Sequence, residues 1–152
     1  MPSFEPMFIK SRGKPIVYKG KTLIMGDDFP LEGADKIRLV FETCNGEWRQ
    51  GVALNCKGSF VFRGESFDGK DGIVFWHDTA PQTVELEIIG KPSTIEVKNV
   101  WDVGDGVIHS WHNRAAMIVE PLADGRRYRC NDGFADDDFD DIVFRLERVA
   151  SA

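Results

Sequence analysis

The chain has few cysteines and no long apolar run, and its N-terminus lacks the pattern of a classical secretory signal. Its three cysteines are an odd number, so a complete disulfide framework is excluded. No C-x-x-C motif is present for a zinc ribbon or a thioredoxin-like site. No stretch approaches the roughly 18 apolar residues of a membrane-spanning helix, so we expect no membrane partner. Because the N-terminus lacks a basic segment followed by an apolar one, we expect a cytoplasmic location.

Basic residues are too scattered to form a nucleic-acid-binding face. The chain has 19 Lys and Arg against 25 Asp and Glu, a formal net charge of −6. Binding to a phosphate backbone requires a positively charged face. We therefore do not expect nucleic acid as a partner.

The short catalytic motifs of common enzymes are also missing. No G-x-S-x-G elbow, P-loop or H-E-x-x-H is present. His109 and His112 are three residues apart, and on a strand this spacing places them on opposite faces. Glu85 or Glu87 with Glu120 are conceivable as a glycosidase pair, but outward-facing strand glutamates are the ordinary explanation. We expect a protein that is not an enzyme, with a small jelly-roll enzyme as a remote alternative.

The apolar pattern predicts β structure. Residues 83–89 alternate strictly, with Val84, Leu86 and Ile88 on one face, which is typical of a half-buried antiparallel strand. No segment shows a convincing helical period with caps. Several short strands with turn residues between them predict an all-β single domain over residues 1–152. We expect an antiparallel β-sandwich or jelly roll of roughly eight to ten short strands, with a partly irregular N-terminal region over residues 1–36.

The dipeptide Asn45-Gly46 follows a predicted strand over residues 37–44. Both residues tolerate the positive φ that a type I′ turn requires. We therefore predict a β-hairpin whose return strand lies near residues 47–54. Such a hairpin would bring Cys44 and Cys56 close together, although free thiols are the expected state in a cytoplasmic protein.

The negative charge is concentrated in one segment near the C-terminus. Residues 132–141 contain six carboxylates and no basic residue, and without these six the rest of the chain is formally neutral. Carboxylates this close repel one another unless a cation or solvent relieves the repulsion. The apolar residues that follow, 142–146, predict a strand.

The spacing of these carboxylates favours a metal site. Three of them alternate along the chain, one more precedes the strand, and an Asp-Gly turn lies upstream. Calcium takes about six to eight oxygen ligands in a flexible shell. We predict Ca²⁺ as the cofactor and list its ligands as Asp132, Asp136, Asp138, Asp140 and Asp141. A purely solvated loop and another divalent ion are the alternatives.

The run Asp136-Asp-Asp-Phe-Asp-Asp-Ile-Val-Phe144 resembles the D-x-D-[FY]-[ND]-D-x-V pattern of bacterial calcium-dependent β-sandwich lectins that bind fucose and mannose. An Asp-Gly turn precedes the pattern in that family, as Asp132-Gly133 does here. The resemblance is confined to this C-terminal motif. It implies that the aspartates are calcium ligands and that Phe139 is an anchor in the core. The chain departs from the family at Asn131, where the family has a Glu ligand, and at Asp140, where it has Asn.

A second acidic loop follows the strand predicted to end near Trp101. We predict Trp101, Asp102 and Asp105 as a ligand-binding group, because an aromatic face can stack on the apolar side of a sugar ring. Packing of the tryptophan in the core is the alternative. The predicted function is calcium-mediated carbohydrate binding by a lectin-like module. A calcium-stabilised structural or protein-interaction domain without sugar binding is the alternative, and a homo-oligomer is left open.

Overall fold

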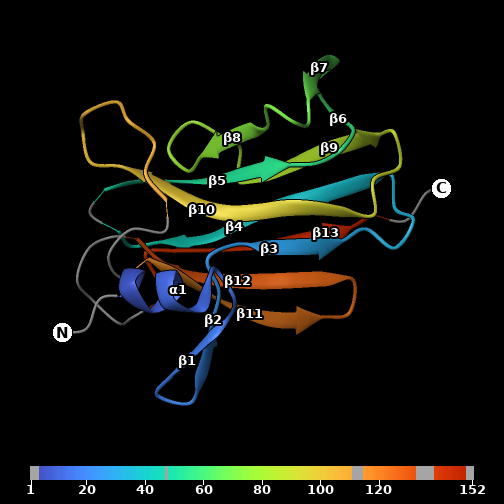
Figure 1. Ribbon diagram of the computed structural model, residues 1–152. Helices are drawn as coiled ribbons and strands as arrows, with labels where there is room; N and C mark the ends of the chain where they lie inside the picture. The colour runs from blue at the N-terminus through green and yellow to red at the C-terminus, as the bar shows by residue number, and fades with distance from the viewer. Residues whose placement is uncertain (1–3, 47, 111–114, 133–138, 150–152) are drawn as a thin grey trace.

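The structure, a computed structural model, describes residues 4–46, 48–110, 115–132 and 139–149 (Figure 1). Its strands are β1 (Ile16–Tyr18), β2 (Lys21–Leu23), β3 (Asp27–Pro30), β4 (Lys36–Cys44), β5 (Arg49–Asn55), β6 (Ser59–Phe62), β7 (Glu65–Asp68), β8 (Ile73–Trp76), β9 (Thr83–Ile89), β10 (Thr94–Asp102), β11 (Ala116–Leu122), β12 (Gly125–Asn131) and β13 (Ile142–Arg148). The all-β sandwich expected from the sequence is confirmed. The described residues form more strands than expected, because the short strands β3 and β7 have no clear apolar alternation.

Two antiparallel sheets form the sandwich. The larger sheet has the order β11-β12-β13-β4-β9-β6-β7, and the smaller has the order β3-β10-β5-β8. A separate two-stranded sheet pairs β1 with β2. Strands β4 and β13 are far apart in the sequence but lie side by side (Figure 1). The end of the chain is therefore built into the middle of the larger sheet.

The core lies between the two sheets. The predicted alternation of β9 is confirmed, because Val84, Leu86 and Ile88 are buried and the residues between them are exposed. Phe29 from the smaller sheet and Phe144 from the larger one belong to the same apolar cluster. Full burial of one such side chain contributes about 1.5–3 kcal/mol, so this cluster supplies much of the stability of the sandwich.

The N-terminal region contains a short helix, which corrects the expectation that no segment is helical. Helix α1 (Glu5–Ser11) has Pro6 in its first turn and ends at Arg12, which adopts φ of 58°. A proline in the first turn is tolerated because its missing N–H has no partner within the helix there. Together with β2 and the start of β11, the residues around α1 form a second, smaller core: Phe4, Phe8, Leu23, Ala116 and Phe139.

The predicted Asn45-Gly46 hairpin is wrong. Strand β4 pairs with β13 and β9, whereas β5 pairs with β10 and β8, so the chain passes from one sheet to the other between them. Neither Asn45 nor Gly46 has a positive φ. Their backbone N–H groups instead donate to the carbonyl of Asp141, at 3.0 and 3.1 Å. The cysteines that the hairpin would have brought together are free thiols, as is Cys130.

The acidic segment, residues 132–141, connects two neighbouring strands of the larger sheet. Strand β12 ends at Asn131 and β13 begins at Ile142, and the two strands are paired along their length. The connection between β4 and β5 packs against the same place through its hydrogen bonds to Asp141. Among the described residues, the single short helix is neither long nor apolar enough to cross a membrane.

Candidate metal centre

The buried polar side chains of the described residues are concentrated at the base of the acidic segment. We call this group the buried polar cluster, and its members are Gln50, Asn99, Asn131, Asp132 and Asp141. Hydrogen bonds link Gln50, Asp132 and Asp141, and a separate bond links Asn99 to Asn131, which precedes Asp132 in the chain. Burying a polar group is unfavourable unless it is partnered. This concentration of buried polar groups makes the base of the acidic segment the candidate site.

A backbone hydrogen bond joins two buried aspartates of the cluster, one at the end of β12 and one at the start of β13. Asp132 follows β12 and is 0% exposed, and Asp141 precedes β13 and is 3% exposed. The backbone N–H of Asp132 donates to Oδ2 of Asp141 at 2.9 Å. The backbone N–H of Asp141 in turn donates to the carbonyl of Cys130 at 3.1 Å. These two buried aspartates are the carboxylate residues that a candidate metal site at this place would use.

The cluster joins the two sheets. Nε2 of Gln50, on β5 of the smaller sheet, donates to Oδ2 of Asp132 at 2.6 Å. Nδ2 of Asn99, on β10 of the same sheet, donates to the carbonyl of Asn131 at 2.9 Å. Both acceptors belong to the end of β12 in the larger sheet. The described base of the acidic segment is therefore held by residues of both layers.

Phe139 fixes the far end of the acidic segment. Its ring is buried in the smaller core and stacks on Phe4 with centroids 6.2 Å apart, as expected of a core anchor. Its backbone N–H donates to Oδ1 of Asn131 at 2.7 Å. Its φ is 52°, a conformation that bulky side chains rarely adopt. Such strain clusters at functional sites, where the surrounding contacts hold it in place.

The structure places three of the five predicted calcium ligands at this base. Asp132 and Asp141 are buried, and Oδ2 of the partly exposed Asp140 accepts from Nδ2 of Asn45 at 3.4 Å. Asp136 and Asp138 lie outside the described residues, so their role stays a prediction. Within the described ranges, no group of three or more His, Cys, Asp or Glu side chains is arranged to hold a metal. A cation bound there would need oxygens of other kinds as well.

Searches of protein-family models, of curated proteins and of solved structures found no match. The cluster offers carboxylate and amide oxygens, which suit hard cations such as calcium, whereas zinc prefers thiolate and imidazole. Burial raises the pKa of the neighbouring Cys130 thiol, so this thiol stays protonated and is a poor ligand for a soft metal.

Three members of the cluster, Gln50, Asn99 and Asn131, were not predicted as a site from the sequence. The sequence does contain a pattern that could have identified Gln50 and Asn99. Gln50 shares one face of β5 with the buried Val52 and Leu54, and Asn99 shares a face of β10 with buried apolar residues. A single amide on an otherwise apolar strand face predicts a buried polar contact. Its partner cannot be found from the strand alone.

The side chains of the second predicted group make contacts within their own loop and the core. The group consists of Trp101, Asp102 and Asp105. Trp101 is 2% exposed and stacks on His109, so its ring packs in the interior and a sugar has no access to it. Oδ1 of Asp102 accepts from the backbone N–H of Gly104 at 2.7 Å. Oδ1 of Asp105 accepts a backbone N–H at 3.0 Å, which lowers the pKa of this carboxyl. These carboxylates stabilise turns of the loop.

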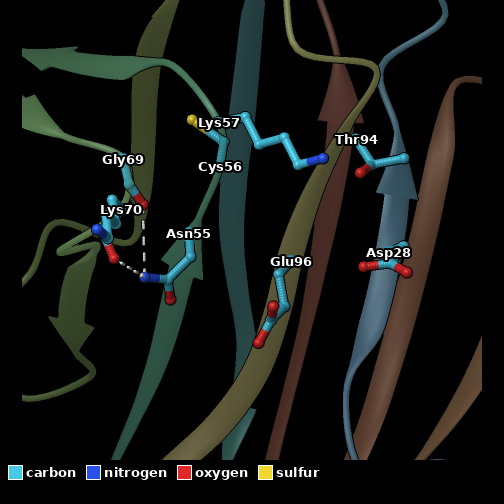
Figure 2. A pocket seen from close by; sticks show the side chains of 8 residues that line it. All are labelled: Asp28, Asn55, Cys56, Lys57, Gly69, Lys70, Thr94 and Glu96. Atoms are coloured by element: carbon cyan, nitrogen blue, oxygen red, sulfur yellow. Dashed lines mark hydrogen bonds between the residues drawn. The ribbon is translucent and has the colours of Figure 1, made fainter.

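A hollow of about 220 Å³ on the outer face of the smaller sheet is a weaker candidate (Figure 2). Asn55, Glu96 and Asp28 lie directly opposite one another on β5, β10 and β3, and Lys57 and Lys70 also line the hollow. The four charged side chains are exposed, so water screens them. The buried polar cluster is therefore the stronger site, and Glu96 serves as a control carboxylate.

Proposed function

We propose that this chain is a calcium-binding β-sandwich module in which the ion binds at the base of the acidic segment. The observation that supports this most directly is the pair of buried carboxylates, Asp132 and Asp141, at adjacent strand ends. Burying one carboxylate costs several kcal/mol, and a nearby cation offsets this cost. A divalent ion at this place would neutralise both charges at once.

Several aspartates of this chain would supply the oxygen ligands of the ion. Asp132 and Asp141 supply carboxylate oxygens from the ends of β12 and β13. Asp140, which is partly exposed, supplies one from the solvent side, and Asp136 and Asp138 remain ligands predicted from the sequence. Calcium is favoured over magnesium because its larger, flexible shell accepts mixed carboxylate and amide oxygens, whereas magnesium requires a near-octahedral one.

Calcium-mediated carbohydrate binding is the more specific form of this proposal. It rests on the sequence resemblance, with sugar hydroxyls completing the shell of the ion. The deep burial of Asp132 and Asp141 supports the alternative, a calcium-stabilised structural or protein-interaction domain. An ion held mainly by buried oxygens would act on the conformation of the acidic segment itself. Both forms require the same ion.

Thermal unfolding in chelator and in increasing calcium tests the proposal. A ligand that binds only the folded state stabilises it by about 2.7 kcal/mol at a concentration 100 times its Kd, so the melting temperature should rise with calcium. Asp132→Asn should lose most of this rise. The matched variant Glu96→Gln removes an exposed carboxylate from the outer hollow and should keep it. A wild-type melting temperature that calcium does not change overturns the proposal.

A glycan array in calcium and in chelator separates the two forms. Glycan binding that chelator abolishes supports carbohydrate recognition. Stabilisation by calcium with no glycan signal supports the structural domain.

A further inference from the structure

The amide of Gln50 is held in one orientation. Its Nε2 donates to two acceptors, Oδ2 of Asp132 at 2.6 Å and the carbonyl of Trp48 at 3.0 Å. Rotating the amide by half a turn would place its oxygen against both of these acceptors, which is repulsive. The positions of the nitrogen and the oxygen are therefore fixed by chemistry.

The oxygen of this amide is the exceptional atom of the cluster. Gln50 is 1% exposed, and its Oε1 is the buried side-chain atom that has no hydrogen-bond partner among the described residues. A buried acceptor without a partner costs about 1–3 kcal/mol. Because the amide head lies against the Asp132 carboxylate, this oxygen belongs to the same cluster as the two buried carboxylates.

The oxygen is of the kind that completes a calcium shell. Side-chain amide oxygens are ordinary calcium ligands, alongside carboxylates and backbone carbonyls. An ionised carboxylate has about four lone-pair sites, so Asp132 can accept the Gln50 hydrogen bond and contact a cation as well. The Gln50 amide therefore has two functions: its nitrogen orients Asp132 and its oxygen is available to the ion.

We infer that Gln50 is a cation ligand contributed by the opposite sheet, so that a bound ion joins the two sheets of the sandwich. This inference rests on the proposed calcium site and deepens it, because it identifies a ligand outside the acidic segment. It also assigns the ion an effect on the whole sandwich. Calcium would then slow separation of the layers as well as fix the acidic segment.

Gln50→Leu tests the inference, because it keeps an apolar side chain at this buried position and removes the amide, including its oxygen. Calcium affinity, measured by isothermal titration calorimetry on the full chain, should fall on the order of 10- to 100-fold. Asn99→Leu is the matched control. It removes the other cross-sheet amide, which donates to Asn131, and it should lower stability equally in calcium and in chelator.

Gln50→Glu is the second variant, and it remains informative if Gln50→Leu does not fold. A third carboxylate beside Asp132 should destabilise the protein in chelator through like-charge repulsion. Calcium should then raise its melting temperature by more than it raises that of the wild type. If calcium stabilises the wild type but shifts Gln50→Glu equally, or binds Gln50→Leu with unchanged affinity, the inference is overturned and the calcium site stands. If calcium does not stabilise the wild type, the calcium site itself fails.

Discussion

Gln50 and Asp132 come from opposite sheets, and the Gln50 amide nitrogen lies 2.6 Å from Oδ2 of Asp132. Both side chains are buried. A hydrogen bond to a charged acceptor contributes about 1.5–3 kcal/mol, more than a bond between neutral groups. The base of the acidic segment is thereby attached to the far layer of the sandwich.

The effect of Asp141→Asn on the melting temperature should have opposite signs in chelator and in calcium. The variant removes one of two adjacent buried charges, so it should melt at or above the wild-type temperature in chelator. In calcium it should melt below the wild type, because it has lost a charged ligand. Its amide oxygen can still accept from the Asp132 N–H, so the fold is kept. Melting curves in both conditions check this, and an unchanged response to calcium would contradict the assignment of Asp141.

Gly46→Ala should weaken calcium binding by displacing two proposed ligands without substituting either of them. An added Cβ would lie 2.5 Å from Nε2 of Gln50 and 3.2 Å from Oδ2 of Asp132, so both side chains would have to move. Overpacking of this kind costs roughly 1–3 kcal/mol. Gly20→Ala is the control, since its Cβ would meet nothing within 4 Å and only its backbone would be strained. Calorimetry should show weaker calcium binding for the first variant and wild-type affinity for the second.

Terbium bound at the site should emit light when the nearby tryptophans are excited. Trp101 lies directly opposite Gln50 in the β5–β10 pair, and the carbonyl of Trp48 accepts from the Gln50 amide. Terbium is a hard cation that replaces calcium at oxygen sites, and nearby tryptophans excite its emission. Emission should appear on adding terbium, fall when calcium competes, and be weaker in Trp101→Phe. Strong emission that persists in Asp132→Asn combined with Asp141→Asn would place the ion elsewhere.

Glu42→Gln should lower the free energy of unfolding at neutral pH and leave it unchanged in acid. Hydrogen bonds from Arg127, at 2.7 Å, and from Arg145, at 2.9 Å, lower the pKa of Glu42 in the folded state. A carboxyl with a lowered folded-state pKa stabilises the protein above its unfolded-state pKa, and this contribution is lost as the pH falls through the folded-state value. Urea unfolding of both proteins should show a difference of roughly 0.5–1 kcal/mol at pH 7, since Glu42 is largely buried between two arginines. The difference should shrink as the pH falls below the unfolded-state pKa and disappear below the lowered folded-state pKa of Glu42. A difference that does not depend on pH would indicate a packing effect.

The local patterns predicted the strands well, and the contacts between distant strands were not predictable. The alternation of β9 is a property of seven consecutive residues, so the sequence shows it directly. Asn45-Gly46 is an equally local signal, but the partner of each strand is decided by the whole sheet. The hydrogen bonds from this dipeptide go to Asp141, which is far along the chain.

The sequence predicted only those residues of the candidate site that belong to the acidic segment. Six clustered carboxylates are visible in the sequence, and adjacent strands bring Asp132 and Asp141 together. Gln50 and Asp132 are 82 positions apart, and no periodicity connects them. The helix at the N-terminus was missed for a different reason. Proline disrupts the interior of a helix but is tolerated in its first turn, so Pro6 does not show from the sequence alone whether a helix begins there.

A crystal structure of the protein grown in calcium, with anomalous diffraction data collected at long wavelength, tests the central claim most directly. The account predicts an anomalous peak about 2.3–2.6 Å from carboxylate oxygens of Asp132 and Asp141. Ordered side chains at both aspartates with no anomalous peak beside them, in crystals saturated with calcium, would contradict it.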